Sequence, residues 1–113
     1  MFFITRHKIK GCLSLTKINI PKLIDSLPDE TFSECESLEE VFLPQGMTTI
    51  GSNSFFNCVS IEKITLPSSI TSIGDSSFSQ CKSLKSFDIP SSVMKIGKSA
   101  FYDCSSLKQI KIP

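Results

Sequence analysis

The chain has 113 residues, of which 40% are hydrophobic and 20% charged, and its formal net charge is +1 at pH 7. This length allows one domain with a core of modest size. A nearly neutral total charge gives no reason to expect a nucleic-acid partner or an acidic membrane surface. No apolar run approaches the roughly 18 residues of a membrane span, so no membrane insertion is expected.

The beginning of the sequence is apolar first and basic second. Met1 to Ile4 precede Arg6, His7 and Lys8, which reverses the order of a secretory signal. The five cysteines are an odd number and cannot all pair within one chain, and no Asn-x-Ser/Thr sequence is present. These features favour a reducing compartment or a bacterial origin. By themselves they predict a cytoplasmic protein.

A period of 23 residues organises the whole chain. The cysteines that follow it are Cys12, Cys35, Cys58, Cys81 and Cys104. The prolines that follow it are Pro21, Pro44, Pro67, Pro90 and Pro113. An aromatic column contains Phe32, Phe55, Phe78 and Phe101, with Ile9 at the equivalent place. Further apolar columns start at Ile4, Leu15, Ile18 and Ile20. A fixed period of about 20–29 residues is typical of a leucine-rich or related solenoid.

Each unit is predicted to contain the same elements in the same order. A short strand such as Leu84 to Ile89 comes first, because its second half alternates between apolar and polar residues. Pro90 ends it, since proline has no N–H to donate to a ladder. Residues 93–96 form a second extended piece that ends at Gly97. Residues 99–104 are predicted to return the chain as a helical or 3₁₀ turn.

The unit from Ile89 to Leu107 resembles the repeat of BspA-like leucine-rich-repeat proteins. The resemblance covers essentially the whole chain. It departs at the start, where Thr5 and Pro28 replace glycine and Ile9 replaces phenylalanine. The asparagine of better-known leucine-rich repeats is also missing, and Gly46, Ser69 and Ser92 stand in its place.

The period and the resemblance together predict one leucine-rich-repeat domain over residues 1–113, made of about five coils of 23 residues. Each coil buries its apolar face against the next. The expected fold is a repeat solenoid, a right-handed β/α superhelix that is mainly β, with short helical or 3₁₀ turns. Its parallel sheet lies on the concave side.

The cysteine column is the most tempting candidate for chemistry. Neighbouring thiols are expected about one strand spacing apart, which does not forbid a disulfide, but inward side chains on parallel coils point alongside each other. Buried free thiols used as small apolar residues are therefore favoured, with oxidised pairing and metal binding as the alternatives. No CxxC motif exists and His7 is the single histidine, so no metal or cofactor is expected.

No arrangement of residues indicates an enzyme. His7 belongs to a basic segment and is interpreted as a surface residue. Ser68-Ser69 and Ser91-Ser92 follow the strand prolines in register, so they are turn residues. The sequence contains no glycine-rich phosphate loop, no GxSxG motif and no recurring pair of carboxylates.

Charge is distributed unevenly along the chain. Residues 1–22 carry basic side chains without an acid, and residues 29–40 carry six acids without a base. Residues 82–111 carry six lysines against Asp88 and Asp103. Opposed patches of this kind can steer a charged partner; the alternative is a set of solvated faces.

Alternation along the first strand of each unit predicts which side chains point outward on the concave sheet. They are Lys17, Asn19, Glu40, Phe42, Lys63, Thr65, Ser86, Asp88, Gln109 and Lys111. We predict that this face binds a protein partner. Phe42 is a candidate anchor because it is an aromatic residue on an otherwise polar sheet, although single exposed apolar residues are also ordinary.

Neither end of the sequence shows the polar capping repeat that solenoids normally carry. Leu107, Ile110 and Ile112 are expected to be exposed together with a strand edge. Either the chain is part of a longer array or its ends pair between copies. The second alternative predicts a homo-oligomer that forms through the end coil.

The leading functional hypothesis is a protein–protein interaction module. The family resemblance implies adhesion, or contact with host proteins or other cells, at a cell surface. The rival is an intracellular scaffold or regulator that binds a cellular protein, for instance an enzyme, through the concave face. A third alternative is that self-assembly is the principal role. The missing signal favours a cytoplasmic location and the resemblance favours the cell surface.

Overall fold

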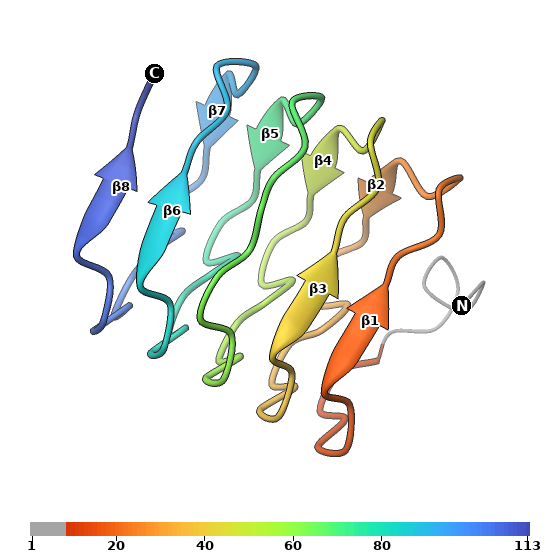
Figure 1. Cartoon of the computed structure of the whole chain (residues 1–113), viewed down its shortest axis with the longest axis vertical. Helices are drawn as coiled ribbons and strands as arrows, with labels where there is room; N and C mark the ends of the chain where they lie inside the picture. Colours follow the sequence, from red (N-terminus) through yellow and green to blue (C-terminus); the bar gives the residue numbers. More distant parts are fainter. Residues whose placement is uncertain (1–8) are drawn as a thin grey trace.

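The computed structural model describes residues 9–113 as one stack of coils with parallel strands on two sides (Figure 1). The predicted repeat solenoid is confirmed. We name each coil by its cysteine: residues 9–20 belong to the Cys12 coil, 21–43 to the Cys35 coil, 44–66 to the Cys58 coil, 67–89 to the Cys81 coil and 90–112 to the Cys104 coil. The predictions for Ile4, Thr5 and His7 lie outside the described residues.

The back sheet is continuous. It contains β2 (Ser26–Leu27), β4 (Thr49–Ile50), β5 (Ser72–Ile73) and β7 (Lys95–Ile96), paired in parallel in that order. The second residue of each strand belongs to one column, which is buried in β2, β4 and β5, and the register advances by one coil at each step. The glycine after β4, β5 and β7 continues the ladder: Gly74 N donates to Ile50 O at 2.8 Å. The predicted second extended piece of each unit is therefore present.

The front sheet is interrupted. It contains β1 (Lys17–Asn19), β3 (Glu40–Phe42), β6 (Ser86–Asp88) and β8 (Gln109–Lys111), but only as the separate pairs β1–β3 and β6–β8. Residues 63–65, which stand at the equivalent place in the Cys58 coil, do not form a strand. In Figure 1 this segment passes between β3 and β6 without an arrow. The sequence pattern predicts a strand there, and the structure differs.

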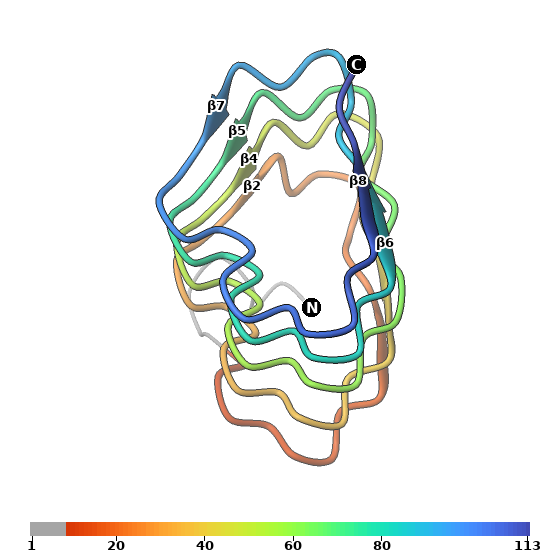
Figure 2. The same cartoon turned by 90° about the vertical axis from the view of Figure 1, so that its left-hand side faces the viewer.

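The return side joins the back sheet to the front sheet (Figure 2) and contains no helix in the described part of the chain. The predicted helical turns are therefore absent. The reason lies in the backbone: two residues per coil have positive φ, as Asn53 (56°) and Asn57 (59°) do, and a right-handed helix cannot pass through them.

On the return side, every second main-chain N–H group donates to a carbonyl oxygen of the next coil. Asn53 N, Phe55 N and Asn57 N donate to Asp75 O, Ser77 O and Ser79 O at 2.8–2.9 Å. The N–H groups between them donate to the carbonyl three residues back, as Phe56 N does to Asn53 O at 3.2 Å, so single turns alternate with bonds between coils and no continuous helix forms. The return side is a third ladder, as regular as the back sheet.

The core between the three sides is a set of columns. Phe32, Phe55, Phe78 and Phe101 stack with ring centroids 5.2–5.7 Å apart and nearly parallel planes. Phe87 from β6 packs edge-on against Phe78 at 5.0 Å and Phe101 at 4.7 Å. Aromatic contacts of this geometry add about 0.5–1.5 kcal/mol each beyond the burial of their surface. They connect neighbouring coils, which have no separate core of their own.

The glycines after the back strands let the coils approach closely. A Cβ on Gly74 would lie 2.6 Å from Ser52 N and 2.7 Å from Gly51 C. Both of those atoms belong to the main chain of the preceding coil, so they cannot move aside as a flexible side chain would. The spacing between coils on this side therefore requires glycine.

Candidate interaction surface

The outward side chains of the front sheet form the surface that we call the front face. All ten residues predicted for it are exposed, whereas Ile18, Val41, Ile64 and Phe87 between them are buried. Phe42 is the aromatic residue of this face, and half of its surface is exposed (50%). Alternation of side chains along a strand placed these residues correctly even in the Cys58 coil, where Lys63 and Thr65 lie outside a regular strand.

The ladder of the front sheet is broken beside β3. At its two ends the sheet has the expected bonds: Ile20 N donates to Phe42 O at 3.0 Å, and Ile89 N donates to Lys111 O at 2.9 Å. Leu43 N is at the equivalent position, but within residues 9–113 no main-chain hydrogen bond joins residues 39–43 to residues 62–66. The Cys58 and Cys81 coils share one such bond on this side, from Lys85 N to Glu62 O at 3.1 Å.

A groove of about 770 Å³ lies at this break, and we call it the front groove. One wall comes from residues 39–45 and the other from residues 60–67. Val41 and Ile64 line it although their side chains point into the core. Their main chain therefore contributes to the floor. Sequence reasoning did not find the groove, because Lys63 and Thr65 follow the same alternation as the residues of the paired strands.

Three of the four charged side chains that line the groove are glutamates. Glu40 pairs with Lys17 of β1 at 3.4 Å, and Glu62 pairs with Lys85 at 3.2 Å. These pairs are exposed and contribute little stability. Glu39 has Glu62 at its own register in the next coil, and no ion pair involves Glu39 or Lys63 within residues 9–113. Glu39 is therefore the acid of the groove that no lysine contacts in this part of the chain.

The predicted charged stretches are divided among the sides of the solenoid. From the acidic stretch, Glu39 and Glu40 belong to the front, whereas Glu34 has positive φ and lies on the return side. From the lysine-rich stretch, Lys111 lies in β8 on the front and Lys95 in β7 on the back. The stretch from residue 82 to residue 111 is therefore not a single basic patch.

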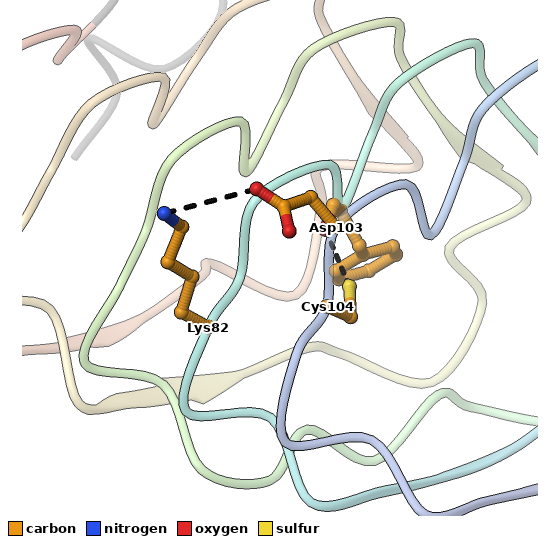
Figure 3. Close-up of polar contacts among 4 residues, drawn as sticks. Lys82, Asp103 and Cys104 are labelled. Atoms are coloured by element: carbon orange, nitrogen blue, oxygen red, sulfur yellow. Dashed lines mark hydrogen bonds and ion pairs between the residues drawn. The ribbon is translucent and has the colours of Figure 1, made fainter.

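The cysteines are free thiols that connect coils by hydrogen bonds. Each Sγ from Cys35 onward donates to the carbonyl oxygen of the aromatic-column residue in the preceding coil, at 3.0–3.2 Å. Figure 3 shows the last of these bonds, from Cys104, beside the ion pair between Lys82 and Asp103 at 3.7 Å. No disulfide is present among the described residues.

Burial suppresses the reactivity of the inner thiols. Burial, together with the neighbouring Cys35 thiol, raises the pKa of Cys58 to about 12. Burial also raises the pKa of Cys81. Cys12 differs because its Sγ hydrogen-bonds with Ser14 Oγ at 3.6 Å, and this contact lowers its pKa. A thiol that stays protonated is neither a nucleophile nor a metal ligand.

The last coil carries the apolar exposure that the sequence predicted. Ile112 is 77% exposed and Ile110 36%, while Leu107 is half-buried. Ile96 of β7 is also exposed (45%), although Ile50 and Ile73 of the same column are fully buried. The sequence analysis did not predict the exposure of Ile96. The signal was available, because Ile96 continues the apolar column of Ile50 and Ile73 into the last coil.

In residues 9–113 no group of three or more His, Cys, Asp or Glu side chains is placed to hold a metal ion. The same part of the chain contains no helix that is long and apolar enough to cross a membrane. The described residues thus present two separate candidate surfaces: the front face with its groove, and the exposed edge of the last coil.

Comparison with known proteins gives one family. The model of the BspA type leucine rich repeat region matches residues 3–113 in six copies. No curated protein matches the chain.

Several solved structures share the fold. A leucine-rich-repeat protein from T. pallidum is 35% identical with a TM-score of 0.91, over 93% of this chain and 49% of its own. One from Bacteroides ovatus is 34% identical with a TM-score of 0.87, over 92% of this chain and 27% of its own. A leucine-rich cell surface protein from Faecalibacterium prausnitzii is 28% identical with a TM-score of 0.73, over 84% of this chain and 31% of its own. The chain thus spans half or less of the length of these proteins.

Proposed function

Because the chain belongs to the BspA-type leucine-rich-repeat family, we propose that it is a protein-binding module whose binding surface is the front face. The observation that carries this proposal is a contrast between the two directions of the front-strand side chains. The inward positions repeat one apolar column, whereas the outward positions change from coil to coil. A column that only has to pack needs repetition, and a surface that recognises a partner needs variety.

The module binds its partner without catalysing a reaction. Burial and hydrogen bonding to main-chain carbonyls keep Cys58 and Cys81 protonated. The residues that vary on the front face are lysines, acids and small polar side chains around Phe42, which suit recognition.

A pull-down from cells tests the front face. Phe42→Ala and Glu40→Lys should each reduce recovery of the partner, because both change the centre of this face. Tyr102→Ala is the matched control: Tyr102 is exposed to a similar degree (63% against 50%) but lies on the return side. If the partner is recovered equally with Phe42→Ala and with wild type, the front face is not the binding surface.

The proposed setting is adhesion, or contact with a host or another cell, at a cell surface. The family and the F. prausnitzii neighbour, described as a cell surface protein, support this setting. The rival is an intracellular scaffold or regulator of a cellular protein. Antibody staining of intact cells should label the protein in the first case. Staining that appears only after permeabilisation favours the rival.

A second candidate role is self-association through the last coil, which rests on the exposure of Ile96, Ile110 and Ile112. A free strand edge beside exposed apolar residues is a template for pairing. Light scattering should show a mass that rises with concentration, and Ile112→Lys should abolish this rise. A stable monomer at high micromolar concentration counts against this role.

A further inference from the structure

The front groove has unpaired main-chain groups along one wall. In the intact parts of the front sheet, the residue after each strand donates its N–H to the next coil, as Ile20 does to Phe42 O. Leu43 stands at the same position, and Thr65 O would be its acceptor, yet this bond is not formed although both residues line the groove. Main-chain donors and acceptors that are left unpaired favour any segment that can satisfy them. An extended chain offers both kinds of group in alternation.

Glu39 lines the groove and makes no ion pair within residues 9–113. Glu40 has Lys17 and Lys63 at its own register in the two adjacent coils, and Glu62 pairs with Lys85. Glu39 has Thr16 and Glu62 as its register neighbours. A cation bound between Glu39 and Glu62 would give Glu39 an ion-pair partner.

An arginine fits this position better than a lysine. Its planar guanidinium carries five N–H donors in a fixed arrangement and can bind two carboxylates at once. A lysine ammonium acts as a point charge and loses more water of hydration on binding.

Phe42 fixes a second contact along the same wall. It follows Glu39 by three residues, which corresponds to about 10 Å along a strand. Phe42 lines the groove and is half exposed, so it offers an apolar surface at that distance from the acidic site. An extended partner has the same rise per residue. Side chains of an extended segment that share a face are separated by an even number of residues, so its basic and apolar side chains would be about four positions apart, within the reach of a long arginine side chain.

We propose that the front groove binds an extended segment of a protein partner that carries an arginine, with the guanidinium between Glu39 and Glu62 and an apolar side chain against Phe42. This inference rests on the proposed function and names the chemistry of the partner. The segment lies along the groove between residues 39–45 and residues 60–67, and its main chain bonds to groups such as Leu43 N–H.

The test uses two synthetic peptides, Gly-Ser-Arg-Ser-Thr-Ser-Leu-Ser-Gly and its reversed order, titrated into the isotope-labelled full chain. Amide shifts should change at Leu43, Lys63 and Thr65 and stay constant in β2, β4, β5 and β7. Glu39→Gln should weaken binding about tenfold or more, because it removes a charged hydrogen-bond acceptor. Glu39 is exposed and makes no ion pair within residues 9–113, so this variant should fold as well as wild type.

Glu34→Gln is the matched control, because it removes the same charge from the same coil on the return side, where Glu34 is also exposed. It should change the affinity by less than about twofold, as long-range charge effects are screened. Replacing the arginine of the peptide by glutamate should abolish binding. Equal weakening by the two variants, equal binding of the glutamate peptide, or no binding up to about 5 mM overturns the inference.

The two proposals fail in different ways. If the peptides do not bind but Phe42→Ala still prevents recovery of the cellular partner, the front-face function stands and the arginine segment is wrong. If the peptides bind in the groove but the front-face variants leave recovery unchanged, the groove binds such segments and the proposed function is wrong.

Discussion

The back and the front of this solenoid have the same repeat but different sheets. On the back, four strands pair without interruption from β2 to β7, and the glycine after β4, β5 and β7 continues the ladder. On the front, the ladder stops beside β3 and resumes at β6, and a groove of about 770 Å³ occupies the break. The return side resembles the back, since its hydrogen bonds also connect every described coil to the next. Two regular sides thus hold the stack together and leave the third free to vary.

The largest effect is expected from alkaline pH, which acts on the return side. Cys58 has its pKa raised to about 12 from an ordinary value of 9.0. The folded chain keeps this proton where the unfolded chain releases it. The stabilisation is therefore fully present below pH 9 and is lost as the pH rises towards 12. The melting temperature should fall steeply across this window.

Two variants separate the thiol from other groups that titrate in the same range. Cys58→Ala should be less stable at neutral pH but lose less stability on going to alkaline pH. Thr65→Ala, on the front, should keep the wild-type pH dependence. An unchanged pH dependence in Cys58→Ala would show that its thiol does not control alkaline unfolding.

Gly74→Ala should be strongly destabilising on the back. The new Cβ would lie 2.6–2.9 Å from main-chain atoms of the preceding coil, so the coils must separate. We expect a loss of about 3 kcal/mol in the free energy of unfolding, at the upper end for overpacking. Urea denaturation measures it. Thr65→Ala on the front should change stability by less than about 0.5 kcal/mol, and equal losses in both variants contradict the contrast between the sides.

Ser54 and Ser77 provide a matched pair on the return side. Both are fully buried at the same place in successive coils, but Ser54 Oγ donates to Gly51 O at 2.6 Å and Ser77 Oγ has no partner. Ala100 occupies this place in the last coil. Ser54→Ala should therefore cost about 1 kcal/mol, whereas Ser77→Ala should be neutral or stabilising. Thermal melting of both variants measures this difference. Equal destabilisation would contradict the different hydrogen bonding of Ser54 and Ser77.

Hydrogen exchange sharpens the description of the front at single residues. Amides at the ends of a stack normally exchange faster than those in its middle. Here Leu43, in the middle, should exchange faster than Ile20 and Ile89 nearer the ends, because those two donate to Phe42 O and Lys111 O. A net hydrogen bond of about 1 kcal/mol predicts a difference of roughly fivefold. Slower exchange at Leu43 would mean that the front ladder is closed in solution.

The sequence predicted the coil and the direction of its side chains. A period of 23 residues in cysteine, proline and phenylalanine left one way to bury every apolar column, and alternation placed Phe42 and the rest of the front face outside. It did not predict the form of the return segment. Residues such as Ser54 and Phe55 do not oppose a helix by themselves, and hydrogen bonds to the next coil decide against it.

The sequence by itself therefore determined the period, the core columns and the identity of the exposed residues, because these depend on side-chain polarity at fixed spacing. Tertiary structure decided where the front sheet opens. Lys63 and Thr65 follow the same pattern as paired strand residues, and the break depends on how far apart two neighbouring coils lie.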